Sequence, residues 1–449
     1  MEELKVGIVS LGCAKNLVDT EIMLGIVNRE GYAISNQVEK ADIIIVNTCG
    51  FIGDAKEESI NSILEMAEYK EKGSCQVLIA TGCLTQRYGK ELLQEIPELD
   101  GIIGTGDYQH IAQVIEDVLK GKKILSINKR GFLYDHTYPR ILSGPPHRAY
   151  VKVAEGCSHR CAFCVIPQLR GKYQSREPDS VLAEVKDLSK KGVKEVNFIA
   201  QDTTAYGKDL GSARINLSYL LKELSKIEGI YWFRILYGYP REITSQLIEV
   251  IAEVNKICNY IDIPLQHSHQ DILKKMKRPL DKEESKELVF RLRERIPGII
   301  IRSTFMVGFP GEKDEHFLDL YRFMKEMEFD RAGVFLYSRE DGTRAAKMKD
   351  QVAEKVKLER FKALMELQQE ISLKKNQSFV SKSLEVLVEG KISPGLFYGR
   401  FYGQAPEVDG VVYINSSRQL IPGQMIKTRI TRSYTYDLEG EEEIEGKIN

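Results

Sequence analysis

Three cysteines in one short segment are the side chains of this chain best suited to metal chemistry. They lie in Cys157-Ser-His-Arg-Cys161-Ala-Phe-Cys164, a C-x3-C-x2-C spacing. Thiolates are soft ligands that favour zinc, copper(I) or iron–sulfur clusters. Structural zinc sites and ordinary iron–sulfur clusters take four protein ligands, but the loop after Cys164 supplies no fourth cysteine. The spacing therefore predicts a cluster that keeps one iron open for a substrate or cofactor.

The alternative is a zinc knuckle in which His159 supplies the fourth ligand. Zinc ribbons carry a second cysteine pair at a typical spacing. No such pair lies near residues 157–164, which favours the cluster over the zinc knuckle.

A second set of three cysteines is spread over the N-terminal part of the chain. Cys13, Cys49 and Cys83 each follow a strand-like apolar run, at 5–10, 42–47 and 76–81. Open parallel sheets bind ligands outside the carboxyl ends of their strands, so we expect these three thiols to converge. The alternative is that they are buried structural cysteines, the usual state of a lone cysteine. Cys75, at the start of the third run, is expected to be structural.

Composition limits the classes of protein to consider. A length of 449 residues suggests about three domains. The net charge of −1 argues against a protein held to nucleic acid mainly by bulk charge. No apolar run approaches the roughly 20 residues of a membrane span, and the polar start is no signal peptide, so we expect a cytoplasmic protein without membrane contact. In the reducing cytoplasm, the eight cysteines of this chain indicate metal or redox chemistry rather than disulfides.

Strand and helix patterns divide the chain into four parts. Residues 1–121 alternate strand-like and helical runs, as in a parallel sheet covered by helices. Residues 122–148 are predicted to form an irregular linker. Residues 149–376 contain six strand candidates separated by amphipathic helices and end in a charged helix, which predicts a barrel-like parallel sheet. Short β-rich runs in residues 377–449 predict a small OB-like β-barrel.

The segment at 157–164, with Phe163 before its last cysteine, resembles the signature of the radical S-adenosylmethionine (SAM) superfamily. The resemblance implies that Cys157, Cys161 and Cys164 hold a [4Fe-4S] cluster whose open iron binds the amino and carboxylate groups of SAM. It also implies that the central sheet is a partial (β/α)6 barrel. An electron-donating partner, a reductase or a flavodoxin-like protein, would then be required.

Over its whole length the chain resembles the methylthiotransferase family, in which the terminal barrel is called a TRAM domain. The motifs that carry the resemblance are Gly12-Cys13, Asn47-Thr-Cys49, Thr81-Gly-Cys83, the segment at 157–164 and Phe309-Pro-Gly-Glu312. The family implies a second [4Fe-4S] cluster, held by the N-terminal set of cysteines.

Residues at the ends of the central strands, or within them, are candidates for SAM contacts. Gln201 and Gln266 follow the second and fourth strands, and Arg234 and Arg302 lie inside strands, where an unpaired charge would be costly. With Phe163, these residues form the expected cofactor-binding set. For any one polar residue, a helix cap or a hydrogen bond inside the barrel is an equally good explanation.

Two branches of the family differ in substrate. One (RimO-like) methylthiolates the β-carbon of an aspartate in small-subunit ribosomal protein twelve, and the other (MiaB-like) methylthiolates a tRNA adenosine. The runs Ser10-Leu-Gly-Cys-Ala-Lys-Asn-Leu-Val-Asp19 and Tyr237-Gly-Tyr-Pro240 resemble the first branch; the tRNA branch typically reads G-C-Q-M-N and T-x-H-P. Residues 377–449 hold 8 Lys/Arg and 10 Asp/Glu, and an acidic domain fits a basic ribosomal protein better than RNA.

The resemblance thus implies an enzyme that replaces an unactivated C–H bond by C–S–CH3. No side chain can remove such a proton at neutral pH, so the cofactors supply the radical chemistry. The alternatives are a tRNA methylthiotransferase, with tRNA as partner, and a non-catalytic iron–sulfur protein that binds RNA or ribosomes.

Overall fold

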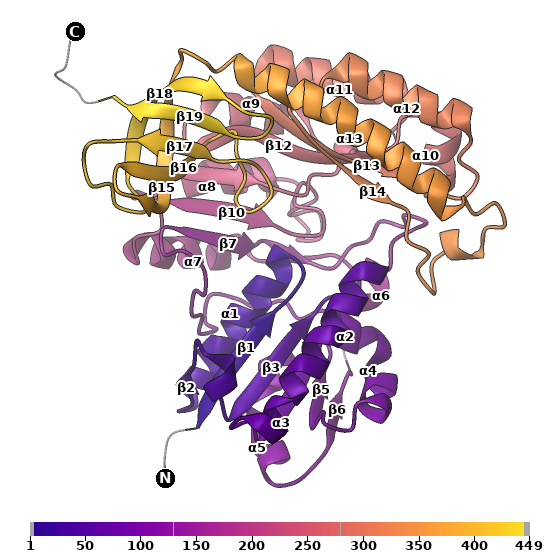
Figure 1. Cartoon of the computed structure of the whole chain (residues 1–449), viewed down its shortest axis with the longest axis vertical. Coiled ribbons are helices and arrows are strands. Elements are labelled where there is room, and N and C mark those ends of the chain that lie inside the picture. Colours follow the sequence, from indigo (N-terminus) through magenta and orange to yellow (C-terminus); the bar gives the residue numbers. More distant parts are fainter. Residues whose placement is uncertain (1–3, 129, 279, 444–449) are drawn as a thin grey trace.

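The computed structural model describes residues 4–128, 130–278 and 280–443. Residues 1–3 and 444–449, which belong to the expected first and last domains, lie outside the described residues. Figure 1 shows an α/β layer below, a larger parallel sheet with its helices above, and a small β-barrel beside that sheet. This arrangement confirms the predicted fold class.

The N-terminal sheet is parallel and has the strand order β2-β1-β3-β4-β5-β6. Its strands are β1 Lys5–Ser10, β2 Ala33–Ile34, β3 Ile43–Thr48, β4 Val77–Gly82, β5 Gly101–Ile103 and β6 Ile124–Ser126. Its helices are α1 Ala14–Arg29, α2 Gly53–Ala67, α3 Tyr69–Lys72, α4 Cys83–Glu95 and α5 Ile111–Leu119. Strands β3 and β4 are entirely buried, as expected for strands covered on both faces. The edge strands β2 and β6 are too short for a periodic pattern, and β6 lies in the stretch expected to be irregular.

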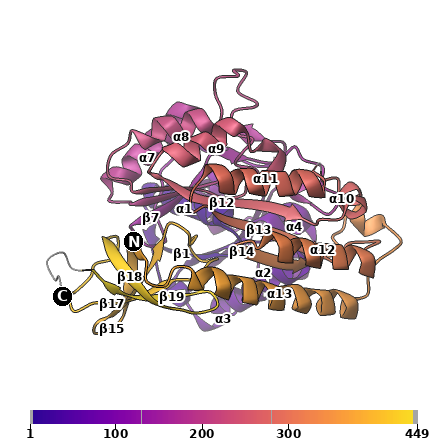
Figure 2. The same cartoon turned by 90° about the horizontal axis from the view of Figure 1, so that it is seen from above.

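The central sheet has six parallel strands in the order β14-β13-β12-β11-β10-β7. They are β7 Arg148–Lys152, β10 Glu195–Ile199, β11 Trp232–Ile235, β12 Ile257–Gln266, β13 Ile300–Val307 and β14 Arg331–Leu336. The helices that follow or cover them are α6 Ile166–Arg170, α7 Pro178–Lys190, α8 Leu217–Ser225, α9 Ser245–Glu253, α10 Gln270–Met276, α11 Lys282–Arg295, α12 Asp314–Met327 and α13 Glu354–Gln377. Because β7 and β14 do not pair with each other, the barrel is partial. Figure 2 shows α7, α8, α9 and α11 along its outer side.

The terminal domain is a closed five-stranded barrel in the order β15-β16-β17-β19-β18. Its strands are β15 Ser383–Ser393, β16 Leu396–Phe401, β17 Val412–Asn415, β18 Met425–Ser433 and β19 Leu438–Glu442. A short pair, β8 Ala154–Glu155 with β9 Gln174–Ser175, flanks the loop that carries residues 157–164. Within the described part of the chain, no helix is both long and apolar enough to cross a membrane.

A buried ion cluster joins the central sheet to the terminal barrel. Glu195 at the start of β10 is fully buried and accepts hydrogen bonds from Arg234 Nε (2.9 Å) and Arg400 Nη2 (2.5 Å). Arg400 also pairs with Glu389, and Arg234 donates to the carbonyl of Tyr402 at 2.5 Å. Burial opposes ionisation of Glu195, but the two arginines outweigh it and lower its pKa. The terminal barrel therefore closes the amino-terminal end of the central strands.

Replacing Arg400 with Ala is expected to destabilise the contact between the central sheet and the terminal barrel, because it leaves the buried carboxylates of Glu195 and Glu389 without this partner. Breaking a buried ion pair costs roughly 3–5 kcal/mol. Denaturant unfolding followed by the fluorescence of Trp232, the single tryptophan and a buried residue of β11, measures the loss. Arg432→Ala is the control: this side chain is 68% exposed and lies 3.8 Å from Glu439, so its removal should cost less than about 1 kcal/mol. Equal losses in the two variants would contradict the prediction.

Candidate functional site

The three clustered cysteines line a cavity of about 500 Å³. The facing wall comes from the turn at Gly342, Thr343 and Arg344, which follows β14. Backbone hydrogen bonds hold the cysteine loop in place: Ala162 donates to Met276 and accepts from Ala345, both at 2.9 Å. The loop is thus fixed from both sides while its thiols face a space large enough for a cofactor.

Burial is the main influence on these thiols. It raises the pKa of Cys157 to about 11 and that of Cys164 to about 12. Both are therefore protonated near neutral pH in the protein alone, and binding of a metal group would release their protons. Arg278 Nη1 lies 3.7 Å from Cys161 Sγ, so one cation already stands beside the set.

The sulfur atoms of neither set are grouped closely enough for one tetrahedral ion. A tetrahedral zinc, with Zn–S bonds of about 2.3 Å, places its sulfurs roughly 4 Å apart. Among the described residues, neither cysteine set has three sulfur atoms that all lie within 4.8 Å of one another. His159 does not complete a zinc site either: its Nε2 lies 2.6 Å from Asp202 and its ring stacks on Tyr239 at 3.6 Å. The donor set suits a multi-iron cluster.

The N-terminal cysteines come together at the carboxyl ends of three neighbouring strands. Cys13 follows β1 and caps α1, Cys49 follows β3, and Cys83 begins α4 directly after β4. Gly12, with a φ of +88°, lies against Cys49: a Cβ there would be 2.8 Å from Cys49 Cβ and 3.1 Å from its sulfur. Only glycine allows this approach, and the expectation that strand ends converge is met.

Charges act differently on the three N-terminal thiols. Desolvation opposes ionisation of Cys13, but the charges of Lys15 and Arg170 outweigh it and lower its pKa. Burial raises the pKa of Cys49 to about 11 and also raises that of Cys83. Cys13 is therefore the thiol of this set that ionises most readily.

Arg170, at the end of α6, ties the two cysteine regions together. Its buried guanidinium donates to Asn16 Oδ1 at 2.5 Å and to Asp19 Oδ2 at 2.7 Å, both on α1. Lys152 Nζ joins the same cluster, with Asp19 Oδ1 at 2.5 Å and Glu155 Oε2 at 2.6 Å. Burial opposes ionisation of Glu155, but Lys152 and Arg170 outweigh it and lower its pKa to about 2. This network fixes the N-terminal domain against the cysteine loop.

The residues expected to contact SAM occupy different places. Gln201 Nε2 donates to Glu155 Oε1 at 3.0 Å, its Oε1 is buried without a partner, and Gln266 ends β12 with a φ of +75°. Phe163 packs against a small apolar cluster around Phe309 and Tyr337. Phe163 lies in the cysteine loop and Gln201 contacts Glu155 beside it, so they remain candidates for SAM contact together with Gln266.

The two arginines face the terminal barrel. Arg234 is committed to Glu195 and Tyr402, so the structure does not bring it to the cysteine cavity. Arg302 Nη1 lies 3.7 Å from Asp262 Oδ1, and its Nε lies 3.8 Å from Asp409 Oδ1. The inward direction expected from their position in strands is correct for Arg234. Its partner is a carboxylate of the protein.

One contact near the site had no role assigned by sequence reasoning. Lys15 Nζ lies 3.3 Å from the centre of the Tyr237 ring. Tyr237 holds a φ of +61° and donates its N–H to Asp262 Oδ2 at 3.0 Å; such backbone strain in a bulky residue clusters at functional sites. Lys15 and Tyr237 belong to the two runs, 10–19 and 237–240, that resemble one branch of the family. Those runs were the only sign in the sequence that the two residues have a role.

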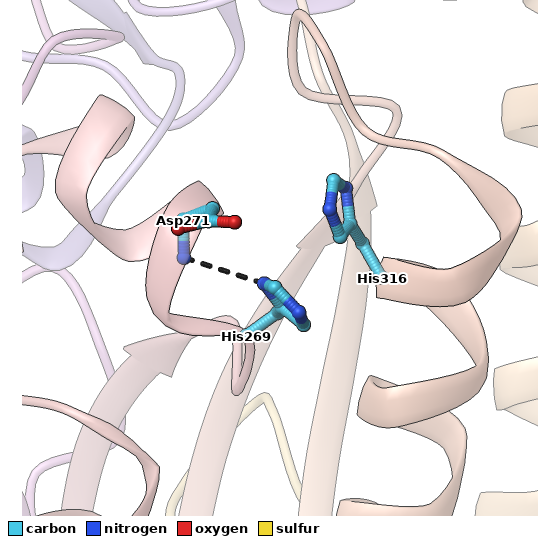
Figure 3. Close-up of side chains that lie close together, drawn as sticks. All are labelled: His269, Asp271 and His316. Carbon is cyan, nitrogen blue, oxygen red and sulfur yellow. Dashed lines mark hydrogen bonds between the residues drawn. The ribbon is translucent and has the colours of Figure 1, made fainter.

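A histidine group outside the cavity has the spacing of a metal site but not its chemistry. The possible ligand atoms of His269, Asp271 and His316 lie within 4.8 Å of one another. Each ring, however, uses Nδ1 to accept a backbone N–H: His269 from Asp271 (3.3 Å; Figure 3) and His316 from Lys313 (3.0 Å). The neutral rings then carry their proton on Nε2, so they serve as helix caps.

Comparisons with known families match all three domains. Residues 5–104 match uncharacterized protein family UPF0004, residues 151–324 the radical SAM superfamily and residues 380–442 the TRAM domain. The ribosomal protein uS12 methylthiotransferase RimO of Thermoanaerobacter sp. (strain X514) is 53% identical over 97% of this chain and 99% of that protein. The same-named protein of Desulforamulus reducens is 51% identical over 97% of this chain and 99% of its own length.

Solved structures share the fold at low identity. The radical SAM methyltransferase TsrM from Kitasatospora setae has a TM-score of 0.57 at 14% identity, covering 88% of this chain and 80% of that one.

Removing the His159 imidazole is expected to leave metal binding at residues 157–164 intact. The His159→Ala variant loses a hydrogen bond to Asp202 and a stacking contact with Tyr239, neither of which is a ligand. Metal analysis after anaerobic reconstitution should give the iron content of the unmodified chain, whereas Cys161→Ala should lower it. Loss of bound zinc in the histidine variant would instead support the zinc knuckle.

Proposed function

Because this chain belongs to the ribosomal protein uS12 methylthiotransferase RimO family, we propose that it methylthiolates the β-carbon of an aspartate in ribosomal protein uS12. The observation that carries the proposal is identity of about half of all residues with such enzymes over nearly the full length of both chains. The two cysteine sets, fixed to one another across a domain boundary, support it. The enzyme would act where ribosomes are made, in the cytoplasm.

Cys157, Cys161 and Cys164 would hold a [4Fe-4S] cluster in the cavity that they line, with room beside them for SAM. When bound, these groups supply one-electron chemistry that removes hydrogen from an unactivated C–H bond. The protein's own residues position the reactants and keep water out. Phe163, Gln201 and Gln266 remain the proposed neighbours of SAM, whereas Arg302, like Arg234, faces the terminal barrel. An external electron donor completes the requirement.

Cys13, Cys49 and Cys83 would hold the second [4Fe-4S] cluster. Their arrangement at three adjacent strand ends supports this, as does the soft-ligand chemistry of three thiols. Arg170 would set the distance between the two clusters, because it contacts α1 from the helix that follows the cysteine loop.

The surface of the terminal barrel does not favour RNA as substrate. The exposed arginines of β18 are matched by acidic neighbours, with Arg429 2.7 Å from Glu443 and Arg432 3.8 Å from Glu439. Two acidic residues of this domain are also unavailable to a partner, because Glu389 pairs with Arg148 and Asp409 accepts a hydrogen bond from Tyr260, both in the central sheet. The net charge of this domain is therefore weaker support for a basic partner than its composition indicates.

The two cysteine sets should be separable by iron analysis. Anaerobic reconstitution is expected to give about eight irons per chain, four for each cluster, and replacing all three cysteines of either set with alanine should halve that value. Losing the set at 157–164 should abolish cleavage of SAM to 5′-deoxyadenosine, whereas losing the N-terminal set should stop only sulfur insertion. Cys75→Ala is the control and should change neither measurement. About four irons in the unmodified chain would exclude the second cluster.

The substrate is tested by incubating the reconstituted enzyme with purified uS12 and, separately, with tRNA. Mass spectrometry of tryptic peptides should show an added methylthio group on one aspartate of uS12, and digested tRNA should be unchanged. Modification of a tRNA adenosine with uS12 unchanged would assign the chain to the tRNA branch instead.

A further inference from the structure

Lys15 is a buried cation without a carboxylate partner. Its relative exposure is 8%, and no acidic side chain in the described part of the chain lies within 4.0 Å of its Nζ. The other buried cations near the cysteine sets, Lys152 and Arg170, each pair with two carboxylates. Burying an uncompensated charge is costly, so such a group is a candidate for function.

The lysine lies where the two cysteine regions meet. It is two residues from Cys13 and contacts the ring of Tyr237. Tyr239, two residues further on, stacks on His159 inside the other cysteine loop at 3.6 Å. A single short segment after β11 therefore reaches from the neighbourhood of one cysteine set to the other, and Lys15 packs against its first residue.

The nearby acidic residue is not free to neutralise this charge. Asp262 accepts the backbone N–H of Tyr237 with Oδ2, and its Oδ1 faces Arg302 at 3.7 Å. Tyr237 offers Lys15 its ring face and its hydroxyl group, and both attract a cation more weakly than a carboxylate does. The ammonium group therefore keeps its capacity for a strong, charge-assisted hydrogen bond to an anion brought by a ligand.

We propose that Lys15 binds the side-chain carboxylate of the substrate aspartate and so selects aspartate over its uncharged amide. The inference rests on the proposed function, in which the reacting carbon is bonded directly to that carboxylate. Anchoring the carboxylate at the junction of the two cysteine regions would hold the neighbouring carbon between them. Positioning of this kind is how an enzyme without a general base controls its reaction.

The competing role for Lys15 is support of the metal site. Its positive charge also favours the thiolate form of Cys13, and a bound cluster would be another anion within reach. The two roles predict different effects of replacing Lys15. If Lys15 supports the metal site, the variant should lose iron or SAM binding; if it binds the carboxylate, only substrate binding should weaken.

The test compares two peptides and three variants. The peptides carry the modified segment of uS12 with its aspartate or with asparagine in its place, and binding to the reconstituted full-length enzyme is measured by fluorescence anisotropy. The unmodified enzyme should prefer the aspartate peptide by at least about 30-fold, the effect of a buried charge pair. Lys15→Met, which removes the charge and keeps a long side chain, should abolish the preference, and Lys15→Arg should retain part of it. Lys120→Met, at a lysine 62% exposed in the same domain, is the matched control and should change nothing.

Lost discrimination in Lys15→Met, with iron content and SAM affinity unchanged, supports the proposal. A retained preference for aspartate overturns it, and so does a loss of iron or SAM binding, which would place Lys15 in the metal site. If the unmodified enzyme methylthiolates no uS12 at all, the proposed function fails, and the inference falls with it.

Discussion

The structure depends on one buried ionic network between the N-terminal domain and the central barrel. Arg170 and Lys152 from the barrel meet Asp19 on α1 and Glu155 beside the cysteine loop. Networks of this kind are stabilising only when every member is paired, and here each charge has a partner of opposite sign. The network therefore stabilises the observed docking of the two domains, and with it the observed separation of the two cysteine sets.

Much of this arrangement could be predicted from the sequence. The C-x3-C-x2-C spacing is local, so its three thiols are close in any fold, and the rule that strand ends share one edge of a sheet was enough to bring Cys13, Cys49 and Cys83 together. The repeated strand and helix pattern predicted six parallel strands. Edge strands of two or three residues, such as β2 and β6, carry too few positions to show a period.

What could not be predicted are contacts between parts that are distant in sequence. The position of Arg234 within a strand indicated that it points inward, but not that the terminal barrel covers that end of the sheet and supplies Tyr402. In the same way, the residues around Lys15 and Tyr237 were noticed as motifs, yet nothing local in either one shows that they touch. Such pairings depend on domain docking, which periodicity and spacing do not report.

The two cysteine sets also differ in how they can be assembled. Cys157, Cys161 and Cys164 lie in one loop, so they are near one another even in the unfolded chain. Cys13, Cys49 and Cys83 are separated by long stretches of chain. Bringing them together in the unfolded chain would cost loop-closure entropy, whereas folding of the sheet already places them side by side. A group held by the N-terminal set would cross-link three strands and stabilise the folded sheet by mass action. Such a group would therefore bind after the N-terminal domain has folded, because only the folded sheet brings its three ligands together.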